Sequence, residues 1–232
     1  MSDSNTSRRV LAVHSSLEPL PAALPRRLPV RRRSDFPNAT GAHLDVAVKL
    51  SSPLMMGPPL CSELVALVQH VFTEDEARLV RRIPLFRGRT AAKIAVAERR
   101  PIDEVTASLE HLATKRRAIG AVGTAGQRKY LWMPIMPGMF EMVLIGESLE
   151  QLSPWHRRFA ELFEALYETG YVAHYLRGRS RPMPVLRAIP IGQTIETHPM
   201  AIPSDRLEVV LERYDAFGIG QCQCRMTAAS VG

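Results

Sequence analysis

Helix start and stop signals alternate at short intervals between residues 61 and 133, and they confine this part of the chain to a series of short helices. Thr73 and Glu76 have the spacing of a capping box, in which each side chain accepts a hydrogen bond from the other residue's backbone N–H. Pro84 ends the helix that follows, and Pro101 takes the first position of another. Apolar residues recur at helical spacing between these signals. The pattern predicts helices at residues 61–72, 74–82, 91–98 and 101–117.

A short β-hairpin is expected after the last of these helices. Residues 118–122 and 127–133 are typical of extended strands, and a glycine-rich turn at residues 123–126 separates them. Helices followed by a two-stranded ribbon form the arrangement of a winged helix-turn-helix. The sequence therefore predicts an α+β protein with a winged-helix domain at residues 61–133.

Residues 134–232 are expected to form a second, small α+β region. The strongest helix signal in the chain begins at Ser153, which can cap the helix, and continues until Gly170. Its apolar stripe includes Trp155, Phe159, Leu162, Phe163 and Leu166. A strand is predicted at residues 185–191 and a further helix at residues 205–214.

Residues 1–60 combine proline, arginine and serine in a way that predicts a disordered basic tail. Eight of the 18 prolines lie here, and no apolar period persists long enough to build an element. Such a segment cannot bury enough surface to offset the entropy of ordering it. The functional alternative is a basic arm that contacts nucleic acid or anionic lipid.

Basic residues surround the predicted helix at residues 101–117 and continue into the hairpin. In DNA-binding winged helices this helix enters the major groove, while cations bind the phosphates. The candidate nucleic-acid-binding residues are Arg99, Arg100, Lys115, Arg116, Arg117, Arg128 and Lys129. Asp103, Glu104 and Glu110 on the same helix would repel a duplex. Binding of double-stranded DNA and a plain protein-interaction role are therefore both open.

Charge and cysteine content exclude several classes of protein. The chain of 232 residues carries 30 Lys and Arg against 23 Asp and Glu, a net charge of +7. No apolar run approaches the roughly 20 residues of a membrane-spanning helix, and none has the form of a secretory signal. Three cysteines do not make a disulfide scaffold, so a reducing cytoplasm is expected. No catalytic constellation is present, so the sequence does not indicate an enzyme.

A C-x-C pair, Cys222 and Cys224, is the motif that points to chemistry. In a turn, the two thiolates can converge on a soft metal centre such as zinc or an iron–sulfur cluster. Arg225 follows directly and would lower the thiol pKa values and offset cluster charge. Two ligands do not complete a site, so a pair of merely structural or reduced thiols is the alternative.

The order of these segments resembles a family of prokaryotic proteins that carry an N-terminal winged helix and C-terminal 4Fe–4S ferredoxin-type motifs. The resemblance covers residues 61–232. It depends on the order of the winged helix, a Pro-Gly-x-Phe-Glu segment at residues 137–141, a long aromatic helix, a strand with the sequence Leu-Arg-x-Ile-Pro at residues 186–190, and C-x-C-R.

The resemblance implies that Cys222 and Cys224 open a cysteine-rich half that holds 4Fe–4S clusters. The protein is then an iron–sulfur redox protein that transfers electrons to a redox partner protein or senses redox state. The present sequence has only the opening pair, so a truncated form without a complete cluster is expected. A DNA-binding transcriptional regulator, or a protein-interaction module without metal, is the alternative function.

Overall fold

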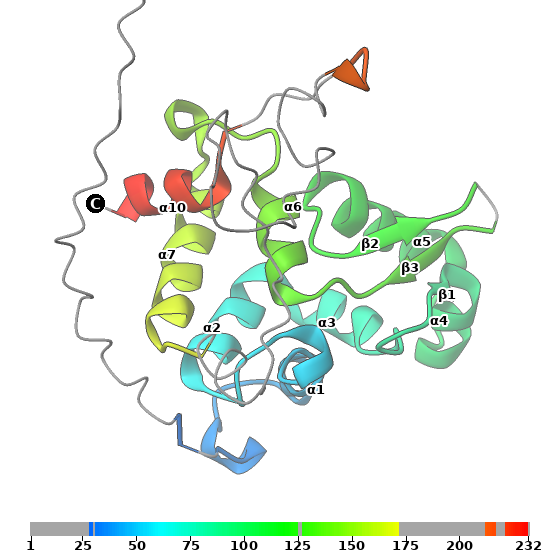
Figure 1. The fold of residues 1–232 in the computed structure, drawn as a ribbon. Helices are drawn as coiled ribbons and strands as arrows, with labels where there is room; N and C mark the ends of the chain where they lie inside the picture. The colour runs from blue at the N-terminus through cyan, green and yellow to red at the C-terminus, as the bar shows by residue number, and fades with distance from the viewer. Residues whose placement is uncertain (1–27, 30, 125–126, 172–211, 217–220, 232) are drawn as a thin grey trace, which may run out of the picture.

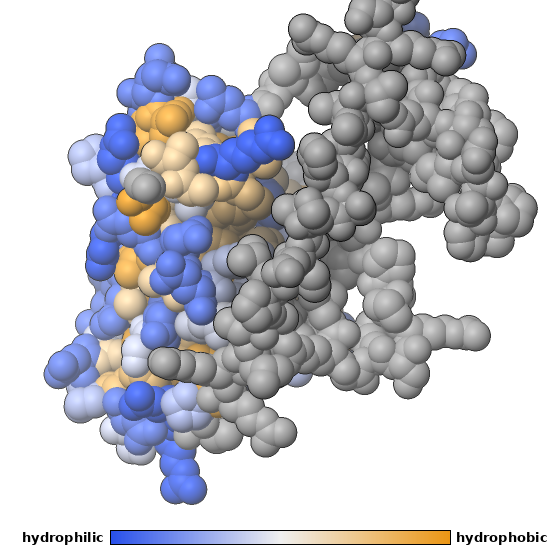
Figure 2. Space-filling model, turned by 60° about the vertical axis from the view of Figure 1, so that its left-hand side comes forward, coloured by the Kyte–Doolittle hydropathy of each residue, from blue (hydrophilic) through white to orange (hydrophobic). Residues whose placement is uncertain are grey.

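The computed structural model describes residues 28–29, 31–124, 127–171, 212–216 and 221–231 (Figure 1). Within these ranges the protein is α+β and mostly helical, with eight α-helices and one small antiparallel sheet of three strands. On the face drawn in Figure 2, hydrophilic side chains surround smaller apolar patches. Each helix in these ranges is too short or too polar to traverse a lipid bilayer.

A helix lies within the segment that the sequence predicts to be disordered. Helix α1 (Gly41–Leu50) starts after Thr40, whose side chain accepts a hydrogen bond from the His43 N–H. His43 also donates from Nε2 to the Phe72 carbonyl oxygen at 2.8 Å, which ties α1 to the end of α2 (Ser62–Val71). The prediction that all of residues 1–60 are disordered is therefore wrong for α1. Residues 1–27 and 30 of the predicted tail lie outside the described residues.

The apolar stripe of α1 explains why this helix forms in a proline-rich neighbourhood. Its buried side chains are those of Ala42, His43, Leu44, Val46, Ala47 and Leu50. They recur at helical spacing and pack against α2 and α3 (Glu74–Val80). Burial of apolar surface contributes about 1.5–3 kcal/mol for a fully buried large side chain, and this offsets the entropy of ordering the segment.

The capping box predicted at the start of α3 is confirmed. The Thr73 side chain accepts from the Glu76 N–H at 3.3 Å, and the Glu76 carboxylate accepts from the Thr73 N–H at 2.8 Å. Helices α4 (Ala91–Glu98) and α5 (Ile102–Glu110) follow at the predicted positions. The helix expected to continue to residue 117 changes at His111–Lys115 into a wider, π-type turn.

The small sheet combines the predicted hairpin with one strand that the sequence did not predict. Strand β2 (Gly120–Val122) pairs with β3 (Lys129–Leu131), and β1 (Arg89–Thr90) pairs with the other edge of β3. All pairs are antiparallel, and the order in the sheet is β1-β3-β2. The chain therefore runs α3, β1, α4, α5, β2, β3 through this part of the molecule (Figure 1).

Helix α7 (Pro154–Glu168) joins the second half of the chain to the first. The Ser153 side chain caps it, as predicted, by accepting from the His156 N–H at 3.3 Å. The helix packs against α2 on one side and against α10 (Gln223–Val231) on the other, while α6 (Phe140–Leu144) stacks its Phe140 ring on Phe163 at 4.0 Å (Figure 1). One hydrophobic core includes residues from both sides of position 133. The strand predicted at residues 185–191 lies outside the described residues, as does nearly all of the helix predicted at residues 205–214.

Candidate functional site

The two cysteines of the C-x-C pair lie at the N-terminal end of α10. Cys222 precedes the helix and Cys224 lies in its first turn, and both are exposed free thiols. The helix is anchored beneath them by Met226 and Thr227, which are 4% and 2% exposed. The Met226 N–H donates to the Cys222 carbonyl oxygen at 2.9 Å. The pair is therefore held on the core by its helix while both cysteines remain exposed.

The segment before α10 is attached to the rest of the fold by Gln221. Its side-chain oxygen accepts a hydrogen bond from the Leu149 N–H at 3.3 Å. Leu149 begins a short 3-10 turn, Leu149–Gln151, that leads toward α7 and contacts α10. The backbone on both sides of Cys222 is consequently positioned by contacts with the core.

Burial raises the pKa of the Cys224 thiol, and its two acidic neighbours add to the effect. The charge of Cys222 and that of Glu141 each raise it further, as does a hydrogen bond with the Cys222 thiol. The net shift is upward, so the prediction that the pKa of the pair is lowered is wrong for Cys224.

Glu141 belongs to the Pro-Gly-x-Phe-Glu segment, and the structure brings this segment to the cysteine pair. The Glu141 carboxylate accepts from the Gly138 N–H at 2.6 Å, at the start of α6, and its charge acts on Cys224. Phe140 next to it is buried against Phe163 of α7. Three sequence segments that carry the family resemblance therefore meet in space at the junction of α6, α7 and α10.

The described residues provide two thiolates of the four that a 4Fe–4S cluster takes. Cys61 lies in the core, where burial raises the pKa of its thiol to about 12. Across the described part of the chain, no group of three or more His, Cys, Asp and Glu residues is arranged to hold a metal ion. The donor set is chemically suited to iron or zinc, but these residues do not complete a cluster.

Four of the seven candidate nucleic-acid-binding residues are engaged in contacts within the fold, and three of these four contact residues far away in the sequence. Arg116 donates from Nη1 to Glu76 at 2.6 Å, and its guanidinium lies 5.5 Å from the centre of the Trp155 ring. Arg117 donates to the Ile145 carbonyl oxygen. Arg128 Nε lies 3.2 Å from the carboxylate of Glu110. These interactions join residues far apart in the sequence, so the local charge pattern could not reveal them.

The remaining three candidates, Arg99, Lys115 and Lys129, are exposed. Arg100 is half-buried and pairs with a carboxylate of its neighbouring helix, with its Nη2 3.5 Å from the Glu104 carboxylate. Arg99 ends α4 in the left-handed conformation. The exposed side of α5 carries acidic and apolar groups, including Asp103, Glu104 and the half-exposed Ile102. The cations that could contact the phosphate groups of DNA therefore lie at the ends of α5 and on the hairpin.

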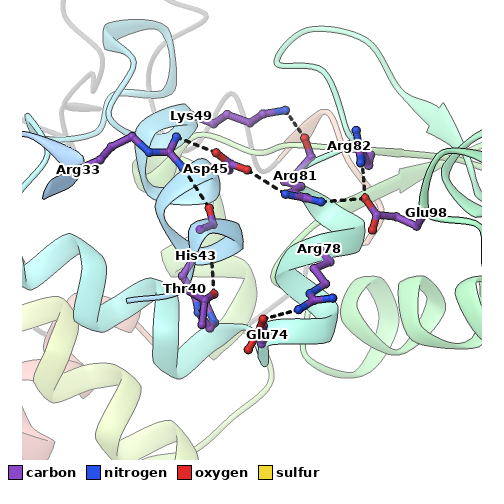
Figure 3. Close-up of polar contacts among 11 residues, drawn as sticks. Arg33, Thr40, His43, Asp45, Lys49, Glu74, Arg78, Arg81, Arg82 and Glu98 are labelled. Atoms are coloured by element: carbon purple, nitrogen blue, oxygen red, sulfur yellow. Dashed lines mark hydrogen bonds and ion pairs between the residues drawn. The ribbon is translucent and has the colours of Figure 1, made fainter. Parts of the chain in front are cut away.

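A second cluster of charges, which the sequence did not predict, lies between α1, α3 and α4 (Figure 3). Asp45 accepts from Arg33 at 2.7 Å and from Arg81 at 3.1 Å, and Glu98 accepts from Arg81 at 3.2 Å and from Arg82. Burial raises the pKa of both carboxyl groups, but the hydrogen bonds and charges of their arginine partners lower it by more. The net pKa of each is therefore lowered, and both stay ionised. The adjacent arginines at 31–33 and 81–82 were the available signal for this cluster.

Comparisons with protein-family models, with curated proteins and with solved structures found no match to this chain.

Proposed function

We propose that this protein is an iron–sulfur redox protein, and that Cys222 and Cys224 are two of the thiolate ligands of its centre. The observation that carries the proposal is the position of the pair. Both cysteines are exposed, and they are two positions apart in the sequence at the start of a helix that is anchored in the core. A structural pair would be buried, whereas ligands for a cluster must be reachable and fixed in position.

The surroundings of the pair support ligation. Its raised pKa keeps the Cys224 thiol protonated at neutral pH, so binding of a soft metal must displace a proton, and ligation is expected to weaken in acid. A cluster held there supplies one-electron chemistry. Two further thiolates are needed, and because the remaining cysteine, Cys61, is buried in the core, they would come from a second copy of the chain.

We propose that residues 74–131 are a winged helix that serves this centre as a docking module. The order α3, β1, α4, α5, β2, β3 and the sheet order β1-β3-β2 support this assignment. The acidic and apolar exposed side of α5, with Asp103, Glu104 and Ile102, favours contact with a redox partner protein over insertion into a DNA groove.

Anaerobic reconstitution of the chain with ferrous iron and sulfide tests the proposed centre. We expect the wild-type protein to retain both elements after desalting, with a rise in molecular mass by light scattering, because two copies together supply four thiolates. Cys222→Ser and Cys224→Ser should each bind at least about tenfold less iron, since loss of a direct ligand costs at least as much as loss of an outer-shell partner.

Cys61→Ala is the matched control, because it removes the one cysteine that is buried away from the pair. It should retain as much iron as the wild type, provided that circular dichroism shows a folded protein. Equal iron in the wild type and in the double variant of Cys222 and Cys224 would reject the proposed ligands.

DNA binding is the second candidate function, and the exposed cations at Arg99, Lys115 and Lys129 favour it. Fluorescence anisotropy with a random duplex should then show binding that weakens steeply as salt increases. Lys129→Gln should reduce the slope of log affinity against log salt by about 0.9, the contribution of one phosphate contact. Arg158→Gln, at an exposed arginine of α7, is the control and should leave the slope unchanged. Absence of binding at low salt would reject this function.

A further inference from the structure

The cluster of charges between α1, α3 and α4 surrounds a cavity, and we propose that this cavity binds a phosphate group. The cavity has a volume of about 290 Å³ and is lined by Arg33, Asp45, Val48, Lys49, Arg81 and Arg82. Pockets for drug-sized ligands have volumes of about 300–1,000 Å³ and are mostly apolar. This cavity is at the lower limit of that range and has a single apolar side chain in its wall, so it suits a small, charged ligand. The inference is independent of the cysteine pair.

The ion pairs around the cavity form a chain that ends in a cation on both sides. Its order is Arg33, Asp45, Arg81, Glu98, Arg82, and each carboxylate is shared by two guanidinium groups (Figure 3). Three guanidinium groups face two carboxylates, so the chain of ion pairs carries one uncompensated positive charge.

The two ends of this chain are the parts that a ligand can reach. The Arg33 and Arg82 side chains are 49% and 39% exposed, whereas Glu98 in the interior is 10% exposed. Arg82 is bound to Glu98 through Nε, and its two terminal nitrogens donate to none of the described residues. A planar guanidinium with free terminal donors binds two oxygens of a phosphate at once.

Lys49 adds a second positive charge to the wall of the cavity. Its ammonium donates to the carbonyl oxygens of Arg81 at 2.5 Å and Ile83 at 2.6 Å, just after the end of α3. Burial lowers the pKa of Lys49, and the charges of Arg89 and Arg82 lower it further against the opposing effect of Asp45. The cations here therefore repel one another, and a bound anion would relieve that repulsion.

A phosphate group can reach this cavity from a free small molecule or from the backbone of a nucleic acid. The first test uses inorganic phosphate, measured by isothermal titration calorimetry and by thermal shift at constant ionic strength with chloride as the balancing anion. Wild-type protein should bind phosphate and melt at a higher temperature in its presence. Arg82→Gln should weaken binding about tenfold or more, the loss expected for a charge-assisted hydrogen bond.

The matched control is Arg78→Gln. Arg78 lies in α3, the helix that directly precedes Arg81 and Arg82. Arg78 is exposed and pairs with Glu74 at 2.6 Å, and it does not line the cavity (Figure 3). This variant should bind phosphate as the wild type does. Arg33→Gln removes the exposed cation at the other end of the chain of ion pairs. Both terminal nitrogens of Arg33 already have partners, Asp45 and the Gly41 carbonyl oxygen, so this variant should weaken phosphate binding less than Arg82→Gln does. It provides a second test if Arg82→Gln fails to fold.

A duplex oligonucleotide distinguishes the two sources of the phosphate. If it binds in an Arg82-dependent manner and inorganic phosphate does not, the ligand is a nucleic-acid backbone. If inorganic phosphate binds with the dependence on Arg33 and Arg82 described above, the ligand is a small phosphate. The proposal is overturned if wild-type protein responds to neither, or if Arg78→Gln weakens binding as much as Arg82→Gln does.

Discussion

Replacement of Arg116 by Ala is expected to lower the free energy of unfolding by about 3 kcal/mol, near the lower end of the cost of breaking a buried ion pair. Arg116 and Glu76 are 19% and 14% exposed, and they lie 2.6 Å apart. The variant leaves the Glu76 carboxylate without its cation in a site that water reaches poorly. Chemical denaturation followed by circular dichroism measures the effect.

Two further contacts add to the loss. Arg116 donates to the Val71 carbonyl oxygen at 2.9 Å, at the C-terminal end of α2, where a cation is favoured by the helix dipole. Its guanidinium also lies over the Trp155 ring of α7 at 5.5 Å. Arg116 therefore joins α2, α3 and α7, and Arg116→Lys should recover only part of the stability because an ammonium cannot make these contacts together.

Lys115→Ala is the matched control for Arg116→Ala. Lys115 is the adjacent residue and is exposed, so its loss should change stability by no more than about 0.5 kcal/mol. If Arg116→Ala is as stable as the wild type but binds DNA more weakly, then Arg116 acts in nucleic-acid binding and does not stabilise the packing of α2, α3 and α7.

Local signals in the sequence were sufficient to predict most of the helices. The capping box at Thr73 and the cap at Ser153 are interactions between residues three positions apart, so the sequence alone specifies them. The hairpin at residues 118–133 was predicted from the glycine-rich turn that joins its two strands. The strand β1 was missed because its two residues are extended only through pairing with β3, 40 positions later. Helix α1 was missed because the prolines on both sides of this ten-residue helix favoured a prediction of disorder over its short apolar stripe.

The partners of charged residues could not be predicted in this way. Arg116 follows Lys115 in a basic run, and nothing near it in the sequence indicates that Glu76 will neutralise it. The same holds for Arg81, which binds Asp45 and Glu98 on two other helices. Such pairs depend on how helices pack against one another, and the local spacing of residues in the sequence does not determine that packing. The cysteine pair, by contrast, was found from its spacing, and its exposure and position on α10 came only from the structure.

Phe159→Ala is expected to lower the free energy of unfolding by about 3–5 kcal/mol, the usual cost of removing a buried phenyl ring. Phe159 is fully buried in α7, between Trp155 at 5.9 Å and Phe163 at 6.1 Å from its ring centre. Trp155 in turn stacks on His70 of α2 at 4.9 Å. The cavity left by Phe159 would therefore loosen the contact between α7 and α2. Tyr167→Ala, in the same helix but 48% exposed, should cost no more than about 0.5 kcal/mol.

The two tryptophans of the chain can test whether the predicted regions before and after residue 133 unfold together. Trp132 lies in the first half of the core and donates from Nε1 to the Ile83 carbonyl oxygen at 3.0 Å, whereas Trp155 lies in α7. Because one core includes both, the fluorescence midpoint of Trp132→Phe and that of Trp155→Phe should each coincide with the circular-dichroism midpoint of the same variant, and Phe159→Ala should shift both fluorescence midpoints equally. If only the Trp155 report moves, then residues 134–232 unfold independently of the first half, and α7 is not the element that holds the two together.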